Sequence, residues 1–239
     1  MSGTRLEVLA VAGVPEVGAG DVLAELIAAA CRPPGPELGD GDVVVVTQKV
    51  VSKAEGRVVA LDPGDAEARR RLVEGEAVRV LRRRGDLVIT ETVHGFVCAN
   101  AGVDLSNVAE GTAALLPVDP DRSARRIRDG LRARAGVEVG VVVSDTFGRP
   151  WRRGATDVAI GCAGVAAVVD LRGQLDALGR ELAVTEVAVA DELAAAAELV
   201  MGKTRNVPVA VVRGVDPAWL RESSVRAEVV RPPAEDLFR

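Results

Sequence analysis

Histidine and cysteine are scarce in this chain, and their scarcity excludes several kinds of site. With His94 as the single histidine, neither a Ser-His-Asp hydrolase nor a metal site with several histidines is expected, and a packed loop histidine is the better interpretation. The three cysteines, Cys31, Cys98 and Cys162, lie far apart without a Cys-x-x-Cys spacing. They predict no disulfide framework and no structural zinc site, so we expect small buried side chains.

Long hydrophobic runs and an excess of positive charge are also missing. No uninterrupted apolar stretch reaches the roughly 20 residues that span a bilayer, and the N-terminus lacks the pattern of a signal peptide. The formal net charge of -5 argues against general nucleic-acid binding. We therefore expect a folded cytoplasmic protein with no membrane and no nucleic acid as partner. Its 239 residues, 48% of them hydrophobic, suffice for one domain over residues 1–239, built as a single core or as two interlocked subdomains.

Lysine is scarce as well. Of the 30 basic residues only three are lysines, Lys49, Lys53 and Lys203, and the other 27 are arginines. A lysine ammonium is a compact point charge that suits a phosphate oxygen, which a bulky guanidinium replaces poorly. Two of the three lysines follow one expected strand, although chance alone can produce such a pattern with three residues.

Apolar segments and amphipathic charged segments alternate along the chain, which predicts a mixed α/β fold. Strands are expected at residues 5–11, 43–46, 87–92, 137–143, 165–171 and 207–212. Helices are expected from Asp21, as the cap, to Ala30, from Asp65 onward, and at residues 121–135 and 191–201. In the second helix, one face would carry Leu72, Val73, Ala77, Val80 and Leu81, and the helix would end at Arg82–Arg84.

The segment after the strand at residues 137–143 is dense in polar, glycine and arginine residues. Asp145 and Thr146 should emerge where that strand ends, which is where α/β proteins commonly bind ligands. Their carboxylate and hydroxyl are hard oxygen donors suited to Mg²⁺ or Mn²⁺, and the guanidinium groups of Arg149, Arg152 and Arg153 suit carboxylates or phosphates. The alternative is a turn capped by Asp145 beside a solvated arginine face.

Two further segments bear on the same site. Asp104 lies in a glycine-containing loop after a strand, where it could share a metal with Asp145 or simply close a turn with its own side chain. Gly202 and Lys203 look like the end of a phosphate-binding P-loop. That motif is rejected, because Ala197 stands where a glycine is required and the segment ends a helix where a P-loop begins one.

Five ordered blocks of the chain resemble one family, the coenzyme F-420-0:L-glutamate ligases, also called F-420 γ-glutamyl ligases. The blocks are Val14–Val17 with Gly20 and Asp21, Thr47–Arg57, Ala101–Asn107, Ser144–Gly154 and Pro208–Gly214. The resemblance covers nearly the whole chain. It implies an intertwined α/β fold that works as a homodimer. Related actinobacterial proteins continue into a nitroreductase-like flavin domain after a stretch like Arg231–Arg239, so we expect a ligase domain without that part, either free-standing or the N-terminal half of a longer protein.

The resemblance also implies an activity and a set of site residues. The family joins L-glutamate to the phospholactate carboxyl of coenzyme F-420-0 at the expense of GTP and then adds further γ-linked glutamates, with GDP and phosphate as products. It implies a divalent metal, Mg²⁺ or Mn²⁺, held by Asp104, Asp145 and Thr146, with K⁺ as a further candidate cofactor. The implied GTP site comprises Val14, Pro15, Glu16, Val17, Gln48, Lys53, Asn107, Gly202 and Lys203. Gln48 departs from the small hydroxyl residue typical of its position.

The residue chemistry agrees with this reading at three positions. Asp104 and Asp145 would neutralise moving phosphate charge through the metal, and Lys53 would add fixed positive potential, so these three are the expected catalytic residues. Arg149, Arg152 and Arg153 would orient the anionic substrates. The alternatives are a related ligase with another acidic acceptor, a non-catalytic GTP-binding regulatory module and a metal-dependent hydrolase.

Overall fold

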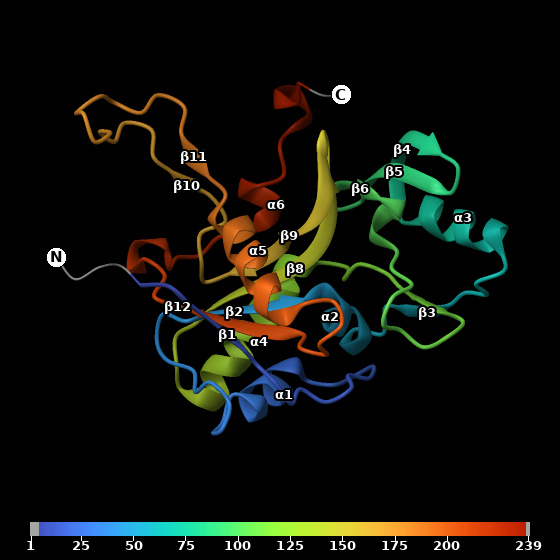
Figure 1. The fold of residues 1–239 in the computed structure, drawn as a ribbon, viewed down its shortest axis with the longest axis horizontal. Coiled ribbons are helices and arrows are strands. Elements are labelled where there is room, and N and C mark those ends of the chain that lie inside the picture. Colours follow the sequence, from blue (N-terminus) through green and yellow to red (C-terminus); the bar gives the residue numbers. More distant parts are fainter. Residues whose placement is uncertain (1–4, 238–239) are drawn as a thin grey trace.

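A five-stranded mixed sheet forms the centre of the computed structural model, which describes residues 5–237 (Figure 1). Its strands, in spatial order, are β1 (Glu7–Ala10), β12 (Val209–Arg213), β2 (Val43–Thr47), β8 (Gly140–Arg149) and β9 (Arg152–Ala163). β2 and β8 are parallel, and the other neighbours pair antiparallel. A mixed α/β fold is therefore confirmed.

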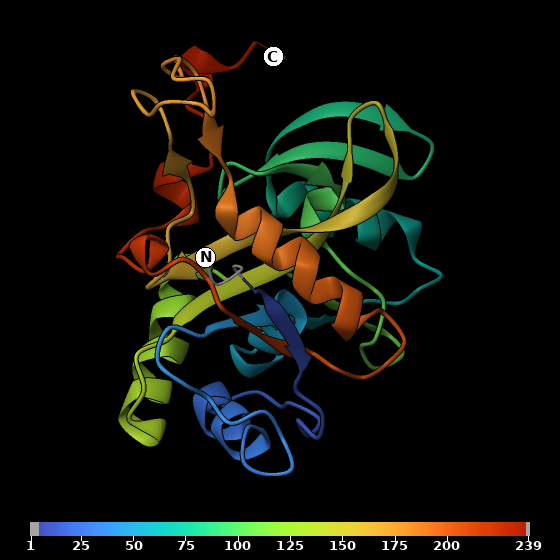
Figure 2. The same cartoon turned by 60° about the vertical axis from the view of Figure 1, so that its left-hand side comes forward.

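Both faces of this sheet are covered, which explains the uninterrupted valine runs in its central strands. Side chains alternate between faces along a strand, so Val44 and Val46 pack with α1 (Leu23–Ala30) and α4 (Pro120–Ala135) on one side. Val43 and Val45 pack with α5 (Val189–Met201) on the other side. Figure 2 shows α5 lying across the sheet on the face opposite α4. The result is a three-layer core around the parallel pair β2 and β8.

Smaller elements surround this core. An antiparallel sheet of β4 (Ala77–Arg84), β5 (Leu87–Thr92) and β6 (Val97–Ala99) packs with α3 (Ala66–Gly75) and forms a separate lobe in Figure 1. The remaining elements are α2 (Gln48–Ala54), β3 (Val58–Ala60), the 3₁₀ turn Asn100–Gly102, β7 (Thr112–Ala114), β10 (Val169–Asp170), β11 (Glu186–Val187), the 3₁₀ turn Pro217–Trp219, α6 (Val225–Glu228) and the 3₁₀ turn Pro233–Glu235. No helix within residues 5–237 is long and apolar enough to cross a membrane.

The long helix expected after Asp65 is wrong in its second half. Asp65 does cap α3, because its side chain accepts the Ala68 N–H at 2.8 Å, but the helix ends at Gly75. Residues from Ala77 onward form β4, so Arg82–Arg84 lie in a strand and do not end a helix. Leu72 to Leu81 fits helical spacing locally, but antiparallel pairing with β5 decides the outcome. Local periodicity cannot anticipate that pairing, because it depends on a separate segment.

Two further expectations about helices and strands need correction, and those about histidine and cysteine are confirmed. The helix expected from Asp21 begins at Leu23 without a side-chain cap, and Asp21 instead accepts the Gly18 N–H at 2.8 Å. The strand expected at residues 165–171 shrinks to the two residues of β10. His94 is a packed loop residue, as expected, since its Nε2 lies 2.9 Å from the Pro117 carbonyl oxygen and its ring stacks on Phe96. The three cysteines are free and buried, as expected.

Candidate functional site

A pocket of about 280 Å³ opens at the carboxyl ends of the parallel strands β2 and β8. The segments that follow the strands lie at this edge of the sheet, where α/β folds commonly bind ligands. Each of the five sequence blocks contributes lining residues: Val14–Val17, residues 47–50 with Lys53, Asp104 with Asn107, Ser144–Thr146, and Pro208. Glu198, Gly202, Lys203 and Asn206 close the pocket from the end of α5. Blocks that are scattered in the sequence therefore meet at one place.

The helix α2 shapes one wall of the pocket. It begins at Gln48, directly after β2 ends at Thr47, so its first turn faces the pocket. Gln48 is buried, and the Ser52 hydroxyl lies 2.8 Å from its Oε1. Lys49 and Lys53 are four residues apart and therefore lie on one face of the helix. This geometry turns the polar segment after β2 into a wall that carries two ammonium groups.

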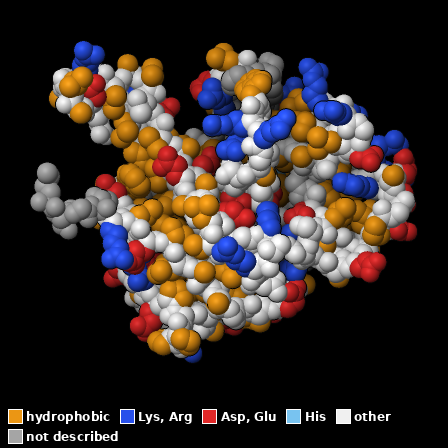
Figure 3. All heavy atoms as spheres, viewed as in Figure 1, with side chains coloured by type: hydrophobic (Ala, Val, Ile, Leu, Met, Phe, Trp, Pro, Cys, Tyr) orange, Lys and Arg blue, Asp and Glu red, His pale blue; other side chains and the backbone are white. Residues whose placement is uncertain are grey.

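All three lysines of the chain line this one pocket. Lys49 Nζ lies 2.8 Å from Asp104 Oδ2, Lys53 forms an ion pair with Glu16, and Lys203 donates to the Thr146 hydroxyl. The few lysines of the sequence therefore place all three of their ammonium groups in one pocket. Figure 3 shows acidic and basic side chains close together near the middle of the face it displays.

The two aspartates in the pocket differ in their electrostatics. At Asp104, burial opposes the charged form, but the hydrogen bonds from Lys49 and from the Ser106 N–H outweigh it and lower the pKa. At Asp145, burial raises the pKa to about 7, the Thr146 N–H opposes this at 2.8 Å, and the negative charge of Asp104 adds to it. Within residues 5–237, no lysine or arginine lies within ion-pair distance of Asp145. One carboxylate is therefore balanced by a cation and the other is not.

The structure adds Asp157, which sequence reasoning missed. It lies on β9 opposite Thr146 and is only 3% exposed. Its Oδ2 accepts from the Ser144 hydroxyl at 2.9 Å, and its Oδ1 accepts from the Thr146 hydroxyl. These contacts fix the direction of the Thr146 hydroxyl. An acid between Thr156 and the apolar run Val158–Ile160 is the sequence signal that could have found it, since such a residue needs a buried partner.

The donor set suits a hard divalent cation. Asp104, Asp145 and Thr146 all line the pocket and supply oxygen atoms, which Mg²⁺ and Mn²⁺ prefer. Residues 5–237 contain no cluster of three or more histidine, cysteine or acidic side chains arranged for a metal. Two carboxylates and a hydroxyl nevertheless match the coordination preference of Mg²⁺. This ion usually binds one or two protein carboxylates and completes its coordination shell with water and substrate phosphates. The carboxylate without a cationic partner, Asp145, further favours a bound cation.

The expected positions of Asp145 and Thr146 need a correction. They do not lie at the end of their strand, because β8 continues to Arg149 and pairs with β9 from Val141 to Arg149. They do lie beyond the end of β2, whose pairing with β8 stops at Thr47 and Ser144. The pocket therefore forms at the point where the sheet loses one neighbour of β8.

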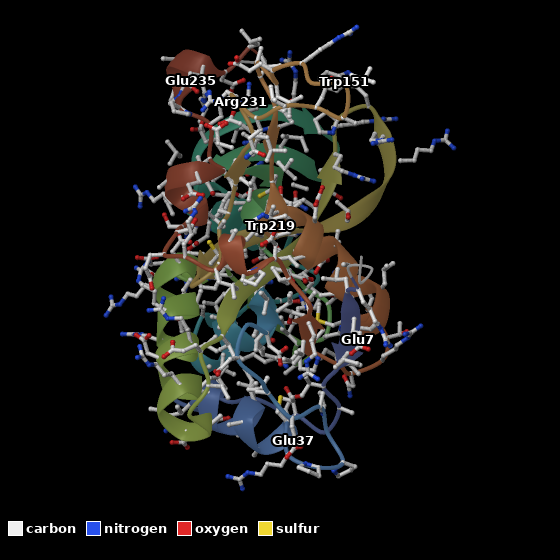
Figure 4. The ribbon with its side chains drawn as sticks, turned by 90° about the vertical axis from the view of Figure 1, so that its left-hand side faces the viewer. Glu7, Glu37, Trp151, Trp219, Arg231 and Glu235 are labelled. Atoms are coloured by element: carbon white, nitrogen blue, oxygen red, sulfur yellow. The ribbon has the colours of Figure 1, made fainter. Side chains whose placement is uncertain are left out.

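The three arginines of the same block are not in the pocket of their own chain. Arg149, Arg152 and Arg153 lie at the exposed turn between β8 and β9, and none of them lines the pocket. Figure 4 labels Trp151 at this turn, where its side chain is 86% exposed. Asn107, by contrast, lies at the pocket, where its Nδ2 donates to the Lys203 carbonyl oxygen at 3.3 Å. The structure thus brings the expected metal and GTP residues together but leaves the arginines apart.

Comparison with known proteins shows related sequences over nearly the whole chain. The family model described as F420-0:Gamma-glutamyl ligase matches residues 13–214. The coenzyme F420:L-glutamate ligase of Methanothermobacter thermautotrophicus is 44% identical over 98% of this chain and 99% of its own length. The proteins of the same name from Methanopyrus kandleri and Methanocaldococcus jannaschii are 45% and 40% identical, over 94% and 84% of this chain and 94% and 85% of their own lengths.

Proposed function

Because the chain belongs to the F420-0:gamma-glutamyl ligase family, we propose that it is a coenzyme F420:L-glutamate ligase. It would join L-glutamate to coenzyme F420-0 through an amide bond and then add further γ-linked glutamates. The observation that supports this most strongly is the convergence of five separate blocks on one pocket that also holds two aspartates and all three lysines.

A carboxylate does not react with an amine unless it is activated. We propose that GTP activates the acceptor carboxylate as an acyl phosphate, which the glutamate amine then attacks, with GDP and phosphate released. Fixed positive charge beside the transferring phosphoryl group lowers the barrier of such a step. Lys53 would take this role: its side chain is 16% exposed at the pocket, and its partner Glu16 is 83% exposed, so the Glu16 carboxylate can turn to water when a phosphate takes its place.

The residues present fit the divalent metal that the family implies. Asp104, Asp145 and Thr146 would hold it, and when bound it would neutralise charge on the phosphate oxygens. Asp157 would keep the Thr146 hydroxyl aimed at the pocket through the hydrogen bond that fixes it now. Val14–Val17 and Asn107 would line the nucleotide, and Gln48, being buried, would support the base of the pocket.

Several expectations stay predictions. They are the homodimer, the interlocked fold that would come with it, K⁺ as a further cofactor, the cytoplasmic location and the role of Arg149, Arg152 and Arg153 with the anionic substrates. The exposed position of these arginines means that they would have to serve a substrate that extends out of the pocket or the site of a second copy.

The activity is tested with purified protein, GTP, Mn²⁺, L-glutamate and coenzyme F420-0, with nucleotide and product mass read from the same tube. The proposal predicts GDP release that requires both co-substrates and a product heavier by glutamate less water. GDP release without glutamate would identify a hydrolase instead. GTP binding without turnover would favour a regulatory module, and turnover with another acidic acceptor would identify a related ligase.

A further inference from the structure

Lys49 forms an ion pair with Asp104, one of the two carboxylates that the proposed function assigns to the metal. Its Nζ lies 2.8 Å from Asp104 Oδ2 and 2.8 Å from the Ser106 hydroxyl oxygen, and its side chain is 14% exposed. The other Asp104 oxygen accepts the Ser106 N–H at 2.7 Å. Both oxygens of Asp104 are therefore engaged by the protein itself, and the ammonium of Lys49 is the cation that balances this carboxylate.

Asp145 provides the contrast within the same pocket. Its Oδ1 accepts the Thr146 N–H at 2.8 Å, and Lys203, whose charge reaches it, bonds to the Thr146 hydroxyl. A divalent cation entering the pocket could approach Asp145 without displacing an ion pair. To use Asp104 as well, it would have to break the contact between Asp104 and Lys49. Binding a metal to Asp104 therefore breaks an ion pair, whereas binding it to Asp145 does not.

We propose that Lys49 is an internal counter-cation that competes with the divalent metal for Asp104 and, when displaced, pairs with the anionic substrate in the same pocket. This inference rests on the proposed function, since it assumes that Asp104 is a metal ligand. Lys49 acts as a positioning residue that couples the binding of the metal to the binding of the nucleotide. The metal alone binds weakly because the partly buried ammonium of Lys49 loses its partner, and the nucleotide supplies a replacement.

Metal binding by Lys49→Gln separates this role from a structural one. Titration of the protein with Mn²⁺ alone, followed by the electron paramagnetic resonance of free Mn²⁺, should show binding about tenfold tighter than wild type, the size of an ordinary coupling between sites. With Mn²⁺ saturating, GTP should bind about tenfold more weakly, because the displaced ammonium is gone. A variant that merely damaged the pocket would weaken both.

Two further variants act as controls. Lys53→Gln lies on the same face of α2 but pairs with Glu16, so its Mn²⁺ affinity should stay within about threefold of wild type while its GTP affinity falls. Lys49→Arg keeps the charge beside Asp104 and should bind Mn²⁺ no more tightly than wild type. If Lys49→Gln were to fold poorly, the Mn²⁺ affinity of Lys49→Arg and the ¹⁵N signal of the Lys49 ammonium in the wild-type protein would still test the proposal.

The nuclear magnetic resonance signals of the lysine ammonium groups test the proposal directly. Since the chain has only three lysines, ¹⁵N labelling of lysine gives three side-chain signals that substitution assigns. Addition of Mg²⁺ should shift the Lys49 signal strongly and the Lys53 signal little. The proposal is overturned if Mg²⁺ or Mn²⁺ binds while the Lys49 signal is unmoved and Lys49→Gln binds Mn²⁺ no more tightly. If wild type and Lys49→Gln both fail to bind Mn²⁺, the metal site of the proposed function fails, and this inference fails with it.

Discussion

Asp145→Asn should make the metal-free protein more stable while abolishing its activity. Burial raises the pKa of Asp145 to about 7 from its ordinary value of 3.8. The difference of roughly three pKa units corresponds to about 4 kcal/mol at 1.36 kcal/mol per unit. Because Asp145 is only partly buried and water screens part of the effect, we expect a gain of roughly 2 kcal/mol at pH 8. The asparagine keeps an oxygen that can accept the Thr146 N–H.

The pH dependence gives this prediction its sign. Below the unfolded pKa of Asp145, both folded and unfolded states bind the proton and the carboxylate costs nothing. Between the ordinary pKa of 3.8 in the unfolded state and the folded pKa of about 7, the unfolded state releases the proton while the folded state keeps it, so wild type loses stability as the pH rises through this window and the loss is complete above it. The advantage of Asp145→Asn should therefore be less than half as large at pH 5 as at pH 8.

Urea denaturation in the presence of a chelator measures this difference at the two pH values. Asp170→Asn is a suitable control, because the pKa of Asp170 is lowered to about 2 by its hydrogen bonds from Arg172, and its substitution should give no gain. A loss of stability in Asp145→Asn, or an equal gain at both pH values, would refute the electrostatic account of this carboxylate. Full ligase activity in the variant would remove Asp145 from the metal site.

Three further substitutions test one contact at the pocket and two contacts elsewhere in the fold. Asp157→Asn should weaken Mn²⁺ binding about tenfold with little change in stability, because the Thr146 hydroxyl loses its fixed direction; metal titration checks this, and unchanged affinity would contradict it. Gly161→Ala should destabilise the fold by about 3 kcal/mol, since the new Cβ would lie 2.3 Å from the backbone carbon of Pro120; urea denaturation close to wild type would be the contrary result. Asp121→Ala should cost about 3 kcal/mol in the same assay, because the carboxylate accepts the N–H groups of Cys162, Val225 and Arg226; a cost below about 1 kcal/mol would be inconsistent with that role.

Features set by local sequence were predictable. The valine run of β2, the Asp65 cap of α3 and most of the extent of α4 follow from residues close by in the chain, and the position of Lys53 beside the pocket follows from the end of β2. Asp104 and Asp145 were predictable as candidates because each carboxylate follows an apolar run of the sequence, although Asp145 lies within β8 and not after it. These residues line the pocket that the structure shows.

Features set by distant contacts were not predictable. β4 is a strand because β5 pairs with it, although its sequence also satisfies helical spacing. The role of Lys49 depends on Asp104, which reaches it only when the loop after β6 folds against α2. Asp157 is held by pairing between β8 and β9, which also carries the arginines away to the exposed turn. Each of these depends on which segments meet in three dimensions.

The most direct test of the ligase assignment is the ratio of GDP released to glutamate incorporated, measured by nucleotide chromatography and product mass on one sample. The account predicts one GDP for each glutamate added, no product with GTP omitted, and neither GDP nor product with Asp145→Asn. Product formed without GTP, or GDP released steadily in the absence of coenzyme F420-0, would contradict it.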